Sequence, residues 1–222
     1  IRDRFAYPKE TAREEVMAKY RIVSHHDRAG RLVDAQEFRF LRFARRQFAP
    51  ELLEELLSSC AGSVRVEGED LVIAHCYLER RLRPLNLYLK EVSREDALRA
   101  VIDYGQAIRD LARSDIFPGD LLLKNFGVTR NHRAIFYDYD ELCQVTDCRF
   151  RELPQATNPE DEMRGESWFY VGDNDVFPET FINFLAFDEA QRAAFMRVHA
   201  EVLTAAFWRA VTGFEVSASR GQ

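Results

Sequence analysis

The sequence has few cysteines and lacks the patterns that give cysteines a structural role. Four occur among 222 residues, and no two are separated by exactly two residues. Because structural zinc sites need such pairs with partners nearby, no zinc site is expected, and the thiols are predicted to be free in a reducing cytosol. With 46% hydrophobic residues, a chain of this length buries a core without cross-links.

Long apolar runs and clusters of basic residues are also missing. The sequence has no run of about 18 apolar residues, the length needed to cross a membrane, and no signal peptide is visible. Basic and acidic residues are mixed, with a net charge of −6, which does not favour nucleic-acid binding. We therefore expect a cytoplasmic protein with neither nucleic acid nor membrane as a partner. The first residue, Ile1, stands within a pattern, so we also expect a piece of a longer protein.

What the sequence does contain is a pattern of short strands with few helices, followed by a mostly helical half. This order predicts an α+β fold in two unequal lobes. The predicted elements are a helix opening at Thr11, a strand at 38–43, helices at 50–57 and 84–89, a hairpin at 64–66 and 71–78, a long helix capped by Ser93 and ending near Ser114, a turn at 131–132, and helices at 178–187 and 188–211.

The most informative stretch spans residues 117–141 and reads FPGDLLLKNFGVTRNHRAIFYDYDE. Four residues separate Asp120 from Asn125, which is the spacing of a protein-kinase catalytic loop. A long predicted helix precedes this loop. A predicted strand–turn–strand follows it and ends at Asp138, where kinases place a magnesium-binding aspartate. The order predicts kinase-like chemistry, with Asp120 as proton acceptor and with Asn125 and Asp138 as metal ligands.

The chemistry of phosphoryl transfer explains why these residue types occur together. The reaction needs a hydroxyl oxygen held in line with the phosphate, and it needs charge neutralised on the phosphate oxygens. Mg²⁺ prefers hard oxygen ligands from one or two side chains, completed by water and phosphate. Lys124 would place a cation beside the transferred phosphate, so it is a further catalytic candidate. ATP and Mg²⁺ are the expected cofactors.

Several signatures of ordinary protein kinases are absent. Phe-Pro-Gly stands before Asp120 in place of His-Arg, and Tyr-Asp follows Asp138 in place of Phe-Gly. The Gly-rich loop and Val-Ala-Ile-Lys do not occur, and no Ala-Pro-Glu follows Asp138, where the end of an activation segment would carry it. The strings that remain resemble the isocitrate dehydrogenase kinase/phosphatase family, to about Val211. They are FPGDLLLKNFGVTR (117–130), FYDYDE (136–141), YLERRLRPLNLYL (77–89), RDRF (2–5), HDRAGR (26–31), PEDEM (159–163) and DVFPE (175–179).

The resemblance implies a protein-kinase-like fold and two activities in one ATP-dependent site. Such an enzyme phosphorylates a serine of isocitrate dehydrogenase and removes that phosphate, which sets the flux between the citric acid cycle and the glyoxylate bypass. It implies that residues 1–83 are the remnant of the small lobe with the hinge, and that 84–222 are the large lobe. The regulatory region and the first strands of the small lobe, with their ATP-binding lysine, would precede Ile1, so these residues alone are expected to be inactive.

The resemblance also assigns roles to individual residues. Asp120 matches the kinase base, and Asn125 and Asp138 match the magnesium ligands. Asp140 matches an aspartate linked to the phosphatase reaction, and Asp34 matches a further active-site aspartate. The segment that matches the adenine-binding hinge consists of Glu79, Arg80, Arg81 and Leu82.

Two other functions stay open from the sequence. A small-molecule phosphotransferase of the aminoglycoside-kinase type uses the same kind of catalytic loop, although Phe117-Pro118-Gly119 stands here in place of its usual H-x-D pattern. A pseudokinase-like binding module is the other alternative. The missing small-lobe signatures favour it, and the intact set of Asp120, Asn125 and Asp138 opposes it.

Overall fold

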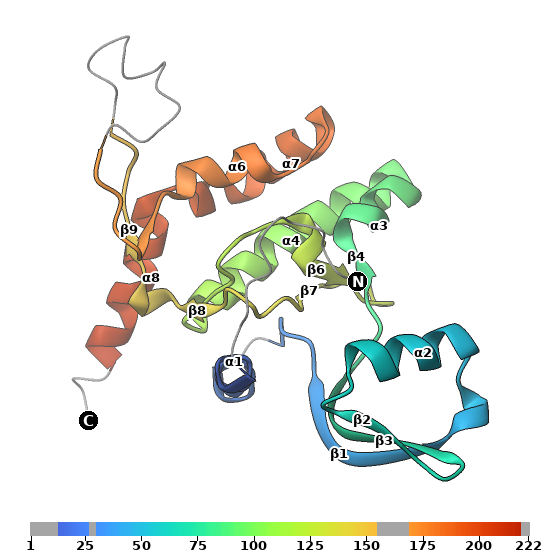
Figure 1. Cartoon of the computed structure of the whole chain (residues 1–222). Coiled ribbons are helices and arrows are strands. Elements are labelled where there is room, and N and C mark those ends of the chain that lie inside the picture. Colours follow the sequence, from blue (N-terminus) through green and yellow to red (C-terminus); the bar gives the residue numbers. More distant parts are fainter. Residues whose placement is uncertain (1–12, 27–29, 155–168, 219–222) are drawn as a thin grey trace. The chain divides into compact units, whose positions relative to one another are not determined.

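The computed structural model describes residues 13–26, 30–154 and 169–218. Helices and short strands are mixed along the chain (Figure 1), in agreement with the predicted α+β class. By their contacts the residues form two compact units, a smaller one of 33–81 and a larger one of 1–32 with 82–222. The interpretation of 1–83 and 84–222 as kinase lobes stays a prediction. No helix in the described residues combines the length and apolar character needed to cross a bilayer.

The smaller unit is an antiparallel sheet with strand order β1-β3-β2. Val64 pairs with Ile73 and Phe38 with Cys76, so the predicted strand and hairpin are confirmed. Leu71 and Val72 are buried, whereas most of the long strand β1 is not. Its elements are β1 (Ala35–Ala44), the 3-10 turn η1 (Arg45–Gln47), α2 (Pro50–Ser59), β2 (Val64–Glu67) and β3 (Asp70–Glu79).

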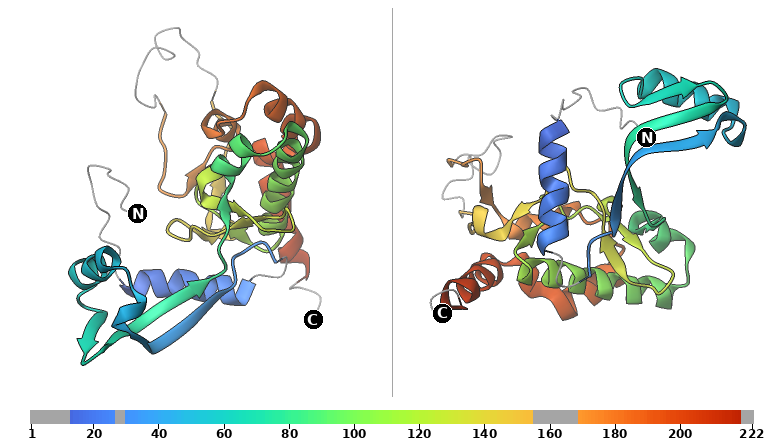
Figure 2. Two further views of the ribbon diagram at one scale, coloured as in Figure 1. Left: turned by 90° about the vertical axis from the view of Figure 1, so that its right-hand side faces the viewer. Right: turned by 90° about the horizontal axis from the view of Figure 1, so that it is seen from below.

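The larger unit is built around α4 (Arg94–Arg113), the clearest helix of the sequence. Ser93 caps it as predicted, because its Oγ accepts a hydrogen bond from the Asp96 amide at 3.1 Å. One face of the helix is fully buried, and the helix ends at Arg113, with Ser114 as its C-cap. In Figure 2 this green helix lies between the yellow strands and the orange and red helices, and its contacts with β7 and α7 agree.

Short elements around α4 carry the loops of interest. One sheet has the order β4-β6-β7, and β5 pairs with β8. The predicted turn at 131–132 is confirmed, with His132 at a positive φ of 58°. The elements are α1 (Arg13–His26), β4 (Arg83–Pro84), α3 (Leu85–Glu91), β5 (Ile116–Phe117), η2 (Leu123–Asn125), β6 (Phe126–Val128), β7 (Ala134–Phe136), β8 (Cys143–Gln144), η3 (Val145–Asp147), β9 (Arg149–Phe150) and β10 (Asp175–Val176).

The C-terminal helices differ from the prediction. The expected single helix at 188–211 is divided into α7 (Glu189–His199), η5 (Ala200–Leu203) and α8 (Ala205–Ala218). Thr204 is extended, and its Oγ accepts a hydrogen bond from the Phe207 amide at 3.3 Å, which starts a new helix. Within 178–187 only η4 (Pro178–Thr180) and α6 (Phe181–Phe184) form. The predicted helix start at Thr11 lies outside the described residues, as does the string PEDEM.

Candidate active site

A tight turn joins β5 to the predicted catalytic loop. Gly119 has φ = +85°, which glycine adopts without steric cost. A Cβ atom at this position would lie 2.4 Å from the Cβ of Glu141 and 2.6 Å from its carbonyl oxygen. Only glycine therefore lets the loop that carries Asp120 approach the segment that carries Asp138, Asp140 and Glu141 so closely.

Asp120 and Asn125 are in direct contact. The Asp120 Oδ1 atom accepts a hydrogen bond from the Asn125 Nδ2 atom at 2.5 Å and another from the Leu122 amide at 2.9 Å. Because the turn of η2 brings residue 125 back over residue 120, a separation of five positions suffices for this contact. The Asn125 nitrogen is used in this bond, so the amide oxygen is the atom of Asn125 suited to a cation.

Two tyrosines hold the backbone of this loop, and the sequence analysis missed both. The Tyr104 hydroxyl, which is buried on α4, donates to the Leu121 carbonyl. The Tyr137 hydroxyl donates to the Lys124 carbonyl, and the Tyr137 amide donates to the Asn125 carbonyl at 3.1 Å. The loop is thus fixed from both sides, while the Lys124 side chain is exposed.

Asp138 lies just after β7, as predicted. Its Oδ1 atom accepts from the Asp140 amide at 3.5 Å, a bond that closes a short turn. Asp138 is half-buried, whereas Asp140 is exposed. Two turns, one before β6 and one after β7, therefore present Asp120 and Asp138, each supported by a neighbouring backbone amide.

Burial and nearby charges act on both Asp120 and Asp138. Burial raises the pKa of Asp120, and the charge of Glu141 raises it further. The hydrogen bonds from the Leu122 amide and Asn125 and the charge of Lys124 lower it in part. Burial also raises the pKa of Asp138, and both Asp140 and Asp120 add to it, while Lys124 opposes it. The carboxylates repel one another across the site, and Lys124 acts on both.

The remaining site candidates lie in or next to the smaller unit. Asp34 is exposed and precedes β1. Glu79 ends β3, and Arg80 and Arg81 follow it, all three exposed. Leu82 belongs to the larger unit, where a Cβ placed on Gly127 would lie 2.5 Å from the Leu82 Cβ. The roles of these residues stay predictions.

The four cysteines carry free thiols, as predicted. Cys143 and Cys148 lie on either side of η3, with 3.5 Å between their sulfur atoms. In the described residues no group of three or more histidine, cysteine, aspartate or glutamate side chains is arranged to hold a metal ion.

Comparison with known proteins identifies the family. The profile of the "Isocitrate dehydrogenase kinase/phosphatase (AceK) kinase domain" matches residues 1–216. The chain belongs to the isocitrate dehydrogenase kinase/phosphatase family. Proteins named isocitrate dehydrogenase kinase/phosphatase are similar along most of this chain. One from Xanthomonas euvesicatoria is 55% identical over 94% of the chain, one from Anaeromyxobacter sp. 53% over 95%, and one from Methylibium petroleiphilum 48% over 94%.

The chain spans only about a third of the length of these relatives, namely 36%, 37% and 34%. The family assignment disfavours both alternatives that the sequence left open, the aminoglycoside-kinase type and the pseudokinase-like module. It also accounts for the departures from ordinary kinases, because the strings around Asp120 and Asp138 were those that resembled the isocitrate dehydrogenase kinase/phosphatase family.

Proposed function

We propose that this chain carries the kinase site of a bifunctional enzyme that phosphorylates a serine of isocitrate dehydrogenase and removes that phosphate. The observation that carries the proposal is the contact between Asp120 and Asn125 beside Asp138, in a chain of this family. The fold proposed is that of a protein kinase, with the hairpin sheet in the small lobe and α4 in the large lobe. The balance of the two activities would set the flux between the citric acid cycle and the glyoxylate bypass.

Asp120 is the proposed base. As the serine oxygen bonds to the γ-phosphorus of ATP, the bond from that phosphorus to the oxygen of the leaving ADP breaks, and Asp120 accepts the hydroxyl proton. Its raised pKa makes it a stronger proton acceptor than an exposed aspartate. Its hydrogen bonds use Oδ1, which leaves Oδ2 for the substrate. Lys124 would face the developing charge on the phosphate.

Asn125 and Asp138 are the proposed ligands of Mg²⁺. Their donor set, one amide oxygen and one carboxylate, is the hard-oxygen set that Mg²⁺ prefers when phosphates complete its shell. Burial raises the pKa of Asp138 most, and the negative charges of Asp140 and Asp120 raise it further; a divalent cation would offset both effects. When bound, the ion neutralises charge on the phosphate oxygens. Adenine is proposed to bind at Glu79, Arg80, Arg81 and Leu82, and Asp34 to serve as a further active-site acid.

The phosphatase reaction is proposed to depend on Asp140. An acid stands here in place of the glycine of ordinary kinases, and its side chain is exposed, so it is accessible to a water molecule. Its backbone amide, which bonds to Asp138, is independent of the side chain. The side chain can therefore act as a base for water, while the backbone amide supports Asp138 and the Asp140 charge acts on Asp138 by repulsion.

Asp140→Ala is expected to lower phosphatase activity by about a hundredfold, the loss typical of a missing general base, and to change kinase activity little. The Asp140 amide that bonds to Asp138 is retained in the variant. Release and transfer of labelled phosphate, measured separately on the natural protein at its full length, check this. Asp147→Ala is the control, since Asp147 is an exposed acid outside the site. Equal losses of both activities would contradict a separate role for Asp140.

Glu141→Gln is expected to shift the acidic limb of the kinase pH profile to lower pH. Asp120 acts only when ionised, so activity falls as the pH drops through its raised pKa, and Glu141 contributes to that rise by charge repulsion. The profile of kcat/KM, which reports the free enzyme, measures the shift. A limb that stays in place would mean that another group titrates there.

A further inference from the structure

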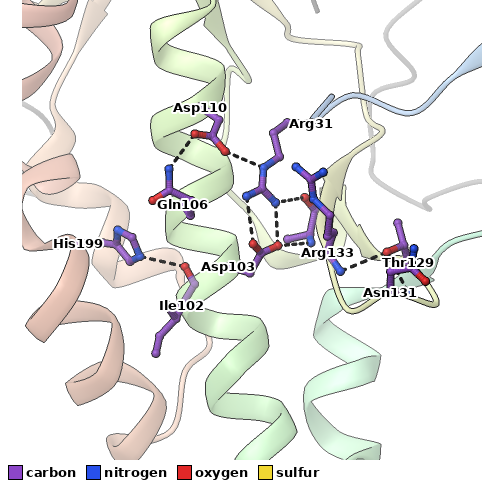
Figure 3. A network of polar contacts seen from close by, with 10 residues as sticks. Arg31, Ile102, Asp103, Gln106, Asp110, Thr129, Asn131, Arg133 and His199 are labelled. Carbon is purple, nitrogen blue, oxygen red and sulfur yellow. Dashed lines mark hydrogen bonds and ion pairs between the residues drawn. The ribbon is translucent and has the colours of Figure 1, made fainter. Parts of the chain in front are cut away.

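A buried arginine outside the proposed site is held by two acids of α4. The Arg31 side chain is 4% exposed. Its Nη1 and Nη2 atoms donate to the two oxygens of Asp103, at 2.7 and 3.0 Å, and its Nε atom donates to Asp110 at 2.8 Å. Figure 3 shows Arg31 between these two carboxylates. Gln106 donates to the other oxygen of Asp110 at 2.7 Å.

The same cluster holds the outer edge of β7. Asp103 accepts a hydrogen bond from the Ala134 amide at 2.6 Å, and Arg31 donates to the Ala134 carbonyl at 3.1 Å. The Arg31 carbonyl accepts from the Phe136 amide at 2.8 Å, and Leu32 forms a parallel bridge to Phe136. The opposite edge of β7 pairs with β6. The strand is therefore fixed on both sides.

The two acids of the cluster differ in what they touch. Asp103 binds Arg31 and also the backbone of β7, whereas the bonds found for Asp110 go to Arg31 and Gln106. Both are partly exposed, at 27% and 21%. Neutralising either acid removes one ion pair with Arg31. Of the two acids, only Asp103 also bonds directly to the backbone of β7.

We propose that Asp103, together with Arg31, is a positioning residue for Asp138 and thereby for the divalent cation. The inference rests on the proposed function, in which Asp138 is a metal ligand. β7 ends at Phe136, two positions before Asp138, so the register of the strand sets where that carboxylate lies. Metal and phosphate geometry depends on ligands being held to within a fraction of an ångström.

The test compares Asp103→Asn with Asp110→Asn in the natural protein at its full length. The probe is Mn²⁺ with ADP, whose dissociation constant is measured by electron paramagnetic resonance, next to the melting temperature of each variant. Both variants lose one charge opposite Arg31, so both are expected to melt earlier. The dissociation constant is expected to rise about tenfold for Asp103→Asn, because a neutral amide holds Arg31 and the Ala134 amide less firmly than a carboxylate does, and to rise little for Asp110→Asn.

The outcomes distinguish a failure of the positioning role of Asp103 from a failure of the metal site at Asp138. Equal dissociation constants for the two variants would show that the cluster is structural only, and would overturn the positioning role. Asp138→Asn must weaken Mn²⁺ binding strongly, and if it does not, the metal site of the proposed function fails and the positioning role with it. Arg31→Lys keeps the charge but loses the two-pronged bond to Asp103. It replaces Asp103→Asn in the comparison if that variant does not fold.

Discussion

Asp120→Asn is expected to lower phosphate transfer to isocitrate dehydrogenase at least about a hundredfold, because the proton acceptor is lost while the loop keeps its shape. The Asp120 Oδ1 atom accepts from the Leu122 amide and from Asn125, and an asparagine oxygen can accept the same two bonds. The loss is therefore chemical. Transfer of labelled phosphate from ATP measures it, with Asp147→Asn as the control acid. Activity above about a tenth of wild type would exclude Asp120 as the base.

The thermal stability of Asp120→Asn is a second measurement, and it is expected to rise while the activity falls. The pKa of Asp120 is raised in the folded state, mainly by burial and then by Glu141, so its ionised form opposes folding. Stability linked to Asp120 is fully present below the unfolded pKa and is lost as the pH rises through the raised folded pKa. Asp120→Asn should accordingly melt at a higher temperature than wild type at neutral pH. A variant that is inactive and less stable would point to structural damage.

The parts of the fold that could be predicted are those controlled by local pattern. The Ser93 cap and the apolar face of α4 follow from helical period, and the hairpin of β2 and β3 follows from alternation around Gly68. The break near Thr204 could not be predicted from period, because the apolar pattern continues through it. A Thr-x-x-Phe cap is too weak a signal without the buried neighbours Val202 and Trp208 that favour the break.

The site shows the same division. The spacing of Asp120, Asn125 and Asp138 could be recognised in the sequence, because a short turn separates the first two and a short hairpin separates the last two. The contacts of Tyr104 with the Leu121 carbonyl, and of Arg31 with Asp103, join residues 17 and 72 positions apart, so no local pattern marks them. The same holds for Glu141, which shifts the pKa of Asp120 from the opposite side of a turn. Partners that meet only through tertiary packing leave no spacing to recognise.

Gly119→Ala is expected to destabilise the larger unit by about 2–4 kcal/mol and to reduce activity along with stability. Two costs combine at this position. A φ of +85° disfavours any residue with a Cβ, and the new methyl group would lie 2.4 Å from Glu141. Relief of that overlap must move one of the two loops that hold Asp120 and Asp138. Urea unfolding gives the free-energy change, and phosphate transfer gives the activity.

Two other glycines separate these costs. Gly30 has a positive φ of 62°, and among the described residues no atom beyond its chain neighbours lies within 4 Å of the place that a methyl group would take, so Gly30→Ala reports mainly the backbone cost, about 1–2 kcal/mol. Gly105 lies within α4, but a Cβ there would lie 2.3 Å from the His199 ring. Gly105→Ala therefore reports overlap without a positive-φ cost, reduced by the roughly 0.5–1 kcal/mol that alanine gains over glycine within a helix. If Gly119→Ala is no more harmful than Gly30→Ala, the Glu141 segment yields easily to the methyl group. In that case the Asp120 and Asp138 loops are not rigidly coupled, and the precise metal geometry would have to come from β7 and its anchor at Asp103.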